Sequence, residues 1–176
     1  MKTVLSIPSK VYNKLKNHLL PKMEDVEEAA FVFTSLFKNK NELIFKYKEW
    51  FPVKVDEFEN RSSFHFELSD EIRAKIIKKA HDLDCSIIEF HSHLGYYPAC
   101  FSYSDWCGFE EFVPHVLWRL KGKHYVAIVM ARSGFDALVW KSKVQNYNFL
   151  DELRVGRIRM YPTRLSLPRR RYYEGE

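Results

Sequence analysis

The chain has 176 residues, of which 46% are hydrophobic and 16% aromatic, and its formal net charge is +5 at pH 7. This composition excludes a disordered chain, and the length suits one domain that buries its own core. Its three cysteines include no Cys-x-x-Cys pair, which argues against a disulfide framework and for a reducing compartment.

The beginning of the chain carries no apolar run long enough for a signal peptide, and no segment approaches the roughly 18 apolar residues of a membrane span. We therefore expect a soluble cytoplasmic protein. The positive charge lies in small clusters, which suit an acidic protein partner. These clusters match no nucleic-acid-binding motif, so neither a membrane nor nucleic acid is expected as a partner.

The first half of the chain predicts two helices separated by strands. Apolar residues recur at helical spacing over residues 9–20, and Pro21 ends that segment. The apolar run 29–37 predicts a buried strand, and residues 42–55 predict a further strand or two. A second helix is expected over 69–83, where a capping sequence precedes an apolar stripe.

The second half begins with a predicted strand over residues 85–93 and a loop over 94–101. A third helix should begin at Ser102. Pro114 is expected to kink it or to start a second helix through Arg119. Further strands are expected over residues 125–131, 135–141 and 157–161.

No internal repeat or low-complexity linker divides the chain. Strands interleaved with helical segments predict an α/β (α+β) domain built around one sheet. We assign this domain to residues 1–165. The tail, residues 166–176, is basic and then acidic, and we expect it to be flexible.

His91 and His93 end the predicted strand 85–93. On a strand this spacing turns both rings to the same face. The pair alone does not distinguish a metal site from ordinary packing. Asp105, at the start of the next helix, could bring a carboxylate back over that face. Two nitrogens and one oxygen form a typical ligand set for a catalytic zinc, with a fourth position open for water.

Ser102 and Asp105 also have a purely structural interpretation. Ser-x-x-Asp before an apolar helical run resembles a capping box, with Ser102 at the N-cap. Both interpretations can hold together, because a helix N-terminus would keep Asp105 rigid beside a metal. The Ser102 hydroxyl could then donate a hydrogen bond to an oxygen near that metal.

Hydrolysis also needs a carboxylate that moves protons without being a metal ligand. The candidates are Glu27, Glu28 and Glu89. Glu89 shares a strand face with the two histidines but lies toward the strand interior. Glu27 and Glu28 open an apolar strand, where a charge is harder to explain by packing.

Taken together, residues 27–33, the His91-Ser-His93 triplet and residues 102–105 resemble the motif of the JAMM, or MPN-plus, zinc metalloproteases. The resemblance is greatest to the prokaryotic JAB-domain proteins and extends over residues 6–161. It implies a single JAB/MPN domain, in which helices flank a mixed β-sheet similar to that of cytidine deaminases.

The resemblance also implies a role for each motif residue. It implies one catalytic Zn²⁺ held by His91, His93 and Asp105. Ser102 would stabilise the tetrahedral oxyanion. Glu27 would be the general acid/base, because the family's spacing from the glutamate to a small residue matches Glu27 with Ala30.

Three departures from the family pattern concern the surroundings of the ligands. The interval between His93 and Ser102 holds eight residues, one more than is usual, so its loop must bulge. Leu94 stands where proline commonly follows, and Ala30 replaces the usual glycine. No ligand is lost, so an active enzyme is expected, with Glu28 as the alternative base.

The function implied is that of a deubiquitinase-like zinc isopeptidase or peptidase. It would hydrolyse the bond after the C-terminal tail of a ubiquitin-like protein, in conjugate removal or precursor processing. The implied partners are that protein and its activating and conjugating enzymes, in a bacterial setting. We expect the loop 94–101, with Tyr96 and Tyr97, to form part of the substrate wall.

Other functions stay open. A noncatalytic MPN-type scaffold would bind partner proteins through the same fold, although such proteins generally lack the ligands. A zinc deaminase would need HxE followed by PCxxC, which the surroundings of Cys100 do not provide, although Cys100 could replace Asp105 as a ligand. No GxSxG or Cys–His context supports a serine or cysteine hydrolase.

Overall fold

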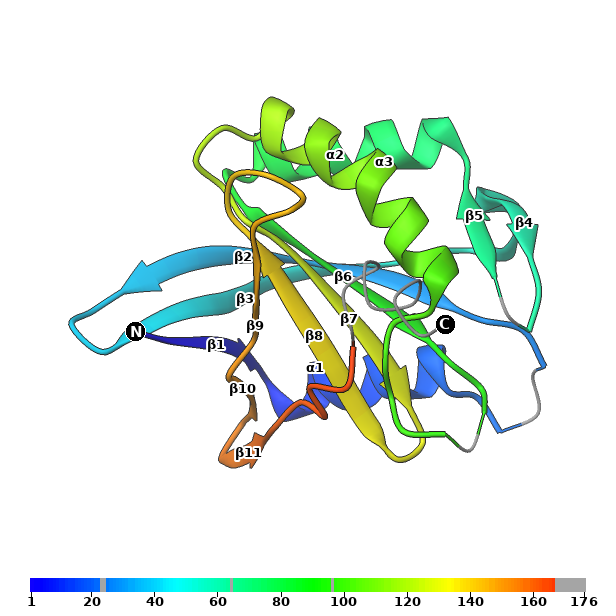
Figure 1. The fold of residues 1–176 in the computed structure, drawn as a ribbon, viewed down its shortest axis with the longest axis horizontal. Helices are drawn as coiled ribbons and strands as arrows, with labels where there is room; N and C mark the ends of the chain where they lie inside the picture. Colours follow the sequence, from blue (N-terminus) through cyan, green and yellow to red (C-terminus); the bar gives the residue numbers. More distant parts are fainter. Residues whose placement is uncertain (23–24, 64, 96, 167–176) are drawn as a thin grey trace, which may run out of the picture.

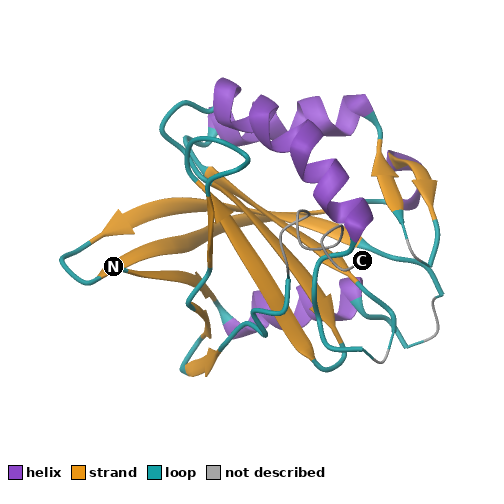
Figure 2. Ribbon diagram, viewed as in Figure 1, coloured by secondary structure: helices purple, strands orange, loops and turns teal. Residues whose placement is uncertain are grey.

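The computed structural model describes residues 1–22, 25–63, 65–95 and 97–166. Its main strands are β1 Lys2–Ile7, β2 Ala29–Lys38, β3 Glu42–Pro52, β6 Ser86–Ser92, β7 Tyr125–Ala131, β8 Gly134–Trp140, β9 Tyr147–Phe149, β10 Glu152–Val155 and β11 Ile158–Met160. Within the described residues these form one nine-stranded curled sheet in the order β11-β10-β1-β3-β2-β6-β7-β8-β9 (Figures 1 and 2).

Three helices and a small hairpin complete the described fold. The helices are α1 Ser9–Leu19, α2 Asp70–Asp82 and α3 Tyr103–Arg119. A 3-10 turn, Val55–Glu57, leads into the hairpin of β4 Phe58–Arg61 and β5 Phe66–Leu68. In Figure 1 this hairpin lies at the right-hand end of the molecule, beside the start of α3.

The helices cover the sheet on both faces. In Figure 1, α2 and α3 lie above the sheet and α1 lies below it. The side chains of β2 contribute to the core on both faces of the sheet, because successive side chains of a strand point to opposite faces. Phe31 and Phe33 join the core shared with α2 and α3, whereas Ala30 and Val32 join the core shared with α1.

Strand β6 lies inside the sheet, and all seven of its residues are buried. It pairs antiparallel with β2 and parallel with β7. Its apolar residues, Ile87, Ile88 and Phe90, pack on both faces of the sheet, and its polar residues Glu89 and His91 are buried with them. Its pairing with β2 sets Ala29 opposite His91. The residues just before β2 therefore run alongside the residues just after β6.

Helices α2 and α3 both begin at the serine caps that the sequence predicts. Ser69 accepts a hydrogen bond from the Ile72 N–H at the start of α2. α3 continues unbroken through Pro114, so a second helix does not form. Pro114 is exposed on the outer face of the helix, where its ring does not disturb the packed side.

The mixed α+β class predicted from the sequence is confirmed. The strands at residues 2–7 and 147–155 were not predicted. None of the helices in the described ranges combines the length and apolar character needed to cross a bilayer. At the predicted domain boundary, Ser166 is buried, and the tail beyond it lies outside the described residues.

Candidate metal centre

His91, His93 and Asp105 come together where β6 ends and α3 begins. The two imidazole rings lie 5.2 Å apart between centroids. His91 Nε2 is 3.4 Å from Asp105 Oδ1, and His93 Nε2 is 3.3 Å from Asp105 Oδ2. One potential ligand atom from each residue lies within 4.8 Å of the others. Cys100 is not part of this group.

The geometry of this group fits a tetrahedral zinc ion. Ligands about 2.1 Å from zinc are separated from one another by about 3.4 Å, which is close to the two measured nitrogen–oxygen distances. His91 is 1% exposed, and among the described residues its two ring nitrogens have no hydrogen-bond partner. A buried polar atom without a partner is uncommon, and a metal ion would satisfy Nε2.

Asp105 is held in place by the cap of α3. The Ser102 N–H and the Ser102 hydroxyl both donate to Asp105 Oδ2, at 2.6 and 2.8 Å. In return, the Asp105 N–H donates to Ser102 Oγ at 3.2 Å. This confirms the predicted capping box. Asp105 Oδ1 is left facing His91, so the cap and a metal site are compatible.

Glu27 lies beside His93 because of the antiparallel register between β2 and β6. Its Oε1 is 3.7 Å from His93 Nε2, and its N–H donates to the Ser62 carbonyl at 2.9 Å. Burial raises the pKa of Glu27, and the positive charges of His91 and His93 only partly offset that. The structure therefore brings a buried carboxylate with a raised pKa next to the candidate ligands.

The other two candidate bases have different partners. Glu28 Oε1 forms an ion pair with Arg61 of the hairpin at 2.6 Å. Glu89 accepts a hydrogen bond from the hydroxyl of Tyr125, and its other oxygen lies 3.6 Å from His91 Nδ1. Glu28 and Glu89 therefore contact residues other than His93. Of the three candidate bases, Glu27 is the one that lies next to His93.

Burial and neighbouring charges shift the pKa values of His91 and Asp105 in opposite directions. Burial alone would lower the pKa of His91, but the Asp105 and Glu89 carboxylates outweigh it and raise the pKa to about 10. Burial would raise the pKa of Asp105, yet His91 and His93 hold it well below its usual range. A metal needs a His91 nitrogen without its proton, so metal binding competes with protonation of this ring.

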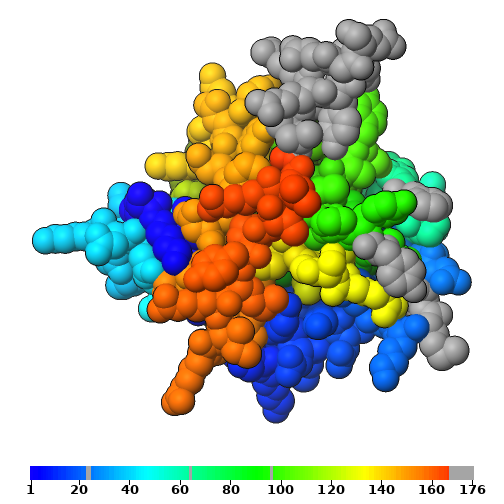
Figure 3. Space-filling view, turned by 60° about the horizontal axis from the view of Figure 1, so that its bottom comes forward, coloured from blue at the N-terminus to red at the C-terminus, as the bar shows by residue number. Residues whose placement is uncertain are grey.

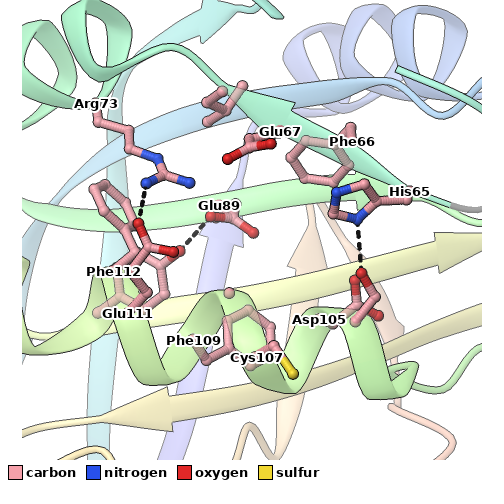
Figure 4. A pocket seen from close by; sticks show the side chains of 14 residues that line it. His65, Phe66, Glu67, Arg73, Glu89, Asp105, Cys107, Phe109, Glu111 and Phe112 are labelled. Carbon is pink, nitrogen blue, oxygen red and sulfur yellow. Dashed lines mark hydrogen bonds and ion pairs between the residues drawn. The ribbon is translucent and has the colours of Figure 1, made fainter. Parts of the chain in front are cut away.

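A pocket of about 210 Å³ adjoins this group on the side of α2. Figure 4 shows Asp105 and Glu89 on its wall, together with His65 from the β4–β5 turn. His65 Nδ1 forms a hydrogen bond with Ser104 Oγ at 2.6 Å. Sequence reasoning did not find His65, because no local pattern links a turn residue to a helix start far along the chain.

The loop between His93 and Ser102 closes another side of the group. The Phe101 ring is buried 5.7 Å from the His91 ring, between centroids. Tyr97 is 83% exposed, and Tyr96 lies outside the described residues. The predicted role of this loop as a substrate wall stays a prediction.

No family model matches the chain, and no curated protein matches it. Among solved structures, the chain is similar to the N-terminal domain of STIL from Trichoplax adhaerens, with a TM-score of 0.34 and 13% identity. That alignment covers 74% of this chain and 37% of the other, so this chain spans about a third of its length. A likeness of this size carries no argument about fold or function.

Proposed function

We propose that this protein is a zinc-dependent peptidase of the JAMM type, built on a JAB/MPN domain. The observation that carries the proposal is the convergence of His91, His93 and Asp105 with a fourth group, the buried Glu27 carboxylate. Two nitrogens, one oxygen and a nearby carboxylate outside the ligand set suit hydrolysis by activated water.

The residues of the site divide the chemistry among them. A zinc ion held by His91, His93 and Asp105 would supply Lewis acidity, which would lower the pKa of a bound water to about 7 and polarise a carbonyl. Glu27 takes the proton from the attacking water and gives it to the leaving amine, a role that suits its raised pKa.

Ser102 is the residue that we propose to stabilise the oxyanion. Its hydroxyl now donates to Asp105 Oδ2. Rotation about the Cβ–Oγ bond redirects that proton toward a developing negative charge. Because Ser102 is also the N-cap of α3, its oxygen is already fixed in place.

The substrate we propose is the C-terminal tail of a ubiquitin-like protein, joined to a lysine or to a short extension. Its activating and conjugating enzymes are proposed as further partners, and the cytoplasm as the compartment. These proposals derive from the motif resemblance. The structure adds a single consistent arrangement of all the motif residues.

The experiment that tests the proposal compares wild type with Glu27→Gln. Both should bind about one zinc ion per chain, because Glu27 is not in the ligand set. Cleavage of ubiquitin-like fusions should fall by about 10²–10⁴-fold in Glu27→Gln, since the proton carrier is lost. Metal content and single-turnover cleavage are the measurements.

Glu28→Gln is the matched control, since Glu28 pairs with Arg61 rather than with His93. It should keep most of the activity. Full activity in Glu27→Gln would contradict the proposed base. If wild-type protein purified without chelators binds no metal, the proposed peptidase function is wrong. The noncatalytic scaffold function would then remain.

A further inference from the structure

Glu89 is a carboxylate enclosed in the core of the domain. It is 7% exposed and lies on β6 among side chains that pack beneath α2 and α3. A buried carboxylate is costly unless polar groups surround it. Its position therefore calls for an explanation beyond packing.

Both Glu89 oxygens face polar groups. The Tyr125 hydroxyl donates to Oε2, and Oε1 faces His91 Nδ1 at 3.6 Å. The parallel register pairs Ile87 with Tyr125, so Glu89 and Tyr125 are diagonal neighbours on one face of the sheet. Tyr125 is fully buried and thereby fixes one side of the carboxylate.

The two nitrogens of His91 face opposite partners. Nε2 faces Asp105 and the candidate metal position, whereas Nδ1 faces Glu89. A neutral imidazole has one N–H and one lone pair, and a metal takes the lone pair. The other nitrogen must then carry the proton, and a carboxylate acceptor fixes that tautomer and the ring orientation.

We propose that Glu89, anchored by Tyr125, is a positioning residue that keeps His91 protonated at Nδ1 and leaves Nε2 free to bind the metal. The inference rests on the metal site of the proposed function. The present 3.6 Å separation exceeds a good N–H···O hydrogen bond by roughly half an ångström, and a small ring rotation would close it.

The same geometry separates Glu89 from the proton carrier. Glu89 lies on the Nδ1 side of His91, whereas Nε2 faces Asp105 on the other side of the ring. Glu27 instead approaches His93. Two carboxylates that look alike in the sequence therefore have different tasks.

The experiment compares the zinc affinity of wild type, Glu89→Gln and Tyr125→Phe by competition with a coloured chelator. Glu89→Gln should bind zinc about 10–100-fold more weakly, as for other acceptors behind a histidine ligand. Tyr125→Phe should show a smaller loss in the same direction. Glu67→Gln is the matched control, because Glu67 lines the same pocket without facing His91, and its affinity should equal wild type.

A second measurement separates positioning from a general loss of structure. Long-range ¹H–¹⁵N NMR of the zinc-loaded protein should show His91 protonated at Nδ1 in wild type, with that proton signal shifted or broadened in Glu89→Gln. Thermal unfolding in the presence of chelator identifies a variant that is weakened only because it folds poorly.

The outcomes are distinguishable. Wild-type zinc affinity and an unchanged His91 signal in Glu89→Gln would overturn the inference and leave the metal site standing. Wild-type protein that binds no divalent metal would overturn the inference and the proposed function together. Zinc binding without peptidase activity would overturn the proposed function, while Glu89 would still be tested by affinity.

Discussion

Asp105 is placed to combine two tasks, helix capping and metal binding, which were expected from the sequence to be compatible. Its Oδ2 accepts hydrogen bonds from the Ser102 N–H and hydroxyl, while its Oδ1 faces His91. A carboxylate has about four lone-pair sites, so one side can cap a helix while the other faces a metal. The cap also limits side-chain motion, which favours precise ligand geometry.

Substitution of Asp105 by asparagine and by alanine should separate the two tasks. Both variants should bind zinc far more weakly than wild type. Without metal, Asp105→Ala should be less stable than Asp105→Asn by about 1 kcal/mol, since the amide oxygen can still accept from Ser102. Urea denaturation and zinc titration are the measurements.

Two results would contradict this interpretation. Equal stability of the two variants would mean that the side-chain cap contributes little to the fold. Zinc binding at wild-type strength by Asp105→Ala would indicate another ligand, for which Cys100 is the first residue to test.

At the scale of elements, residues 161–166, which follow β11, connect β8 to the loop that precedes α3. Asp136 of β8 is fully buried and accepts from the Arg164 N–H and from the hydroxyl of Ser166. Ser166 Oγ in turn accepts from the Phe101 N–H at 2.9 Å. In Figure 3 this segment, orange to red, lies on the surface near the centre of the view, with green and yellow regions of the chain to its right.

Ser166→Ala should destabilise the protein by about 1–3 kcal/mol, because the Phe101 N–H loses its acceptor. Asp136 Oδ2 loses the hydroxyl donor and keeps the Ser166 N–H. Hydrogen exchange at the Phe101 amide should become faster, and urea denaturation should report the lost stability. Ser133→Ala is the control, since the Ser133 hydroxyl also donates a hydrogen bond, to the Tyr97 carbonyl, but this residue is exposed. It should change stability by less than about 0.5 kcal/mol. Unchanged exchange at Phe101 would contradict the role of this segment.

At the scale of the molecule, the metal group connects parts of the chain that are distant in sequence. Glu27 precedes β2, the histidines end β6, and Asp105 begins α3. A ligand that binds only the folded state raises its stability, so a bound metal would strengthen the contact between the sheet and α3.

Zinc at about 100 times its Kd should increase the free energy of unfolding by about 2.7 kcal/mol, and chelator should reverse the change. His93→Ala should show no increase at the same zinc concentration, because one ligand is lost. Differential scanning calorimetry with and without zinc measures both. An equal increase in His93→Ala would mean that zinc binds elsewhere.

Local patterns in the sequence were enough to predict the helices and the strands of the sheet centre. The apolar run of β2 and the capped stripe of α2 are typical of their structures. β1 was missed because it pairs in parallel with β3 and β10, strands brought beside it from separate parts of the chain. Such pairing leaves no turn signal nearby, and parallel partners are never joined by a tight hairpin.

The sequence by itself determined the candidate ligands, because the strand period places His91 and His93 on one face and a serine cap positions Asp105. Tertiary structure decided what each glutamate contacts. The register of β2 against β6 brings Glu27 to His93, the hairpin gives Glu28 its Arg61, and β7 gives Glu89 its Tyr125. These contacts join separate strands, and the identity of a strand's neighbour is a property of the folded sheet.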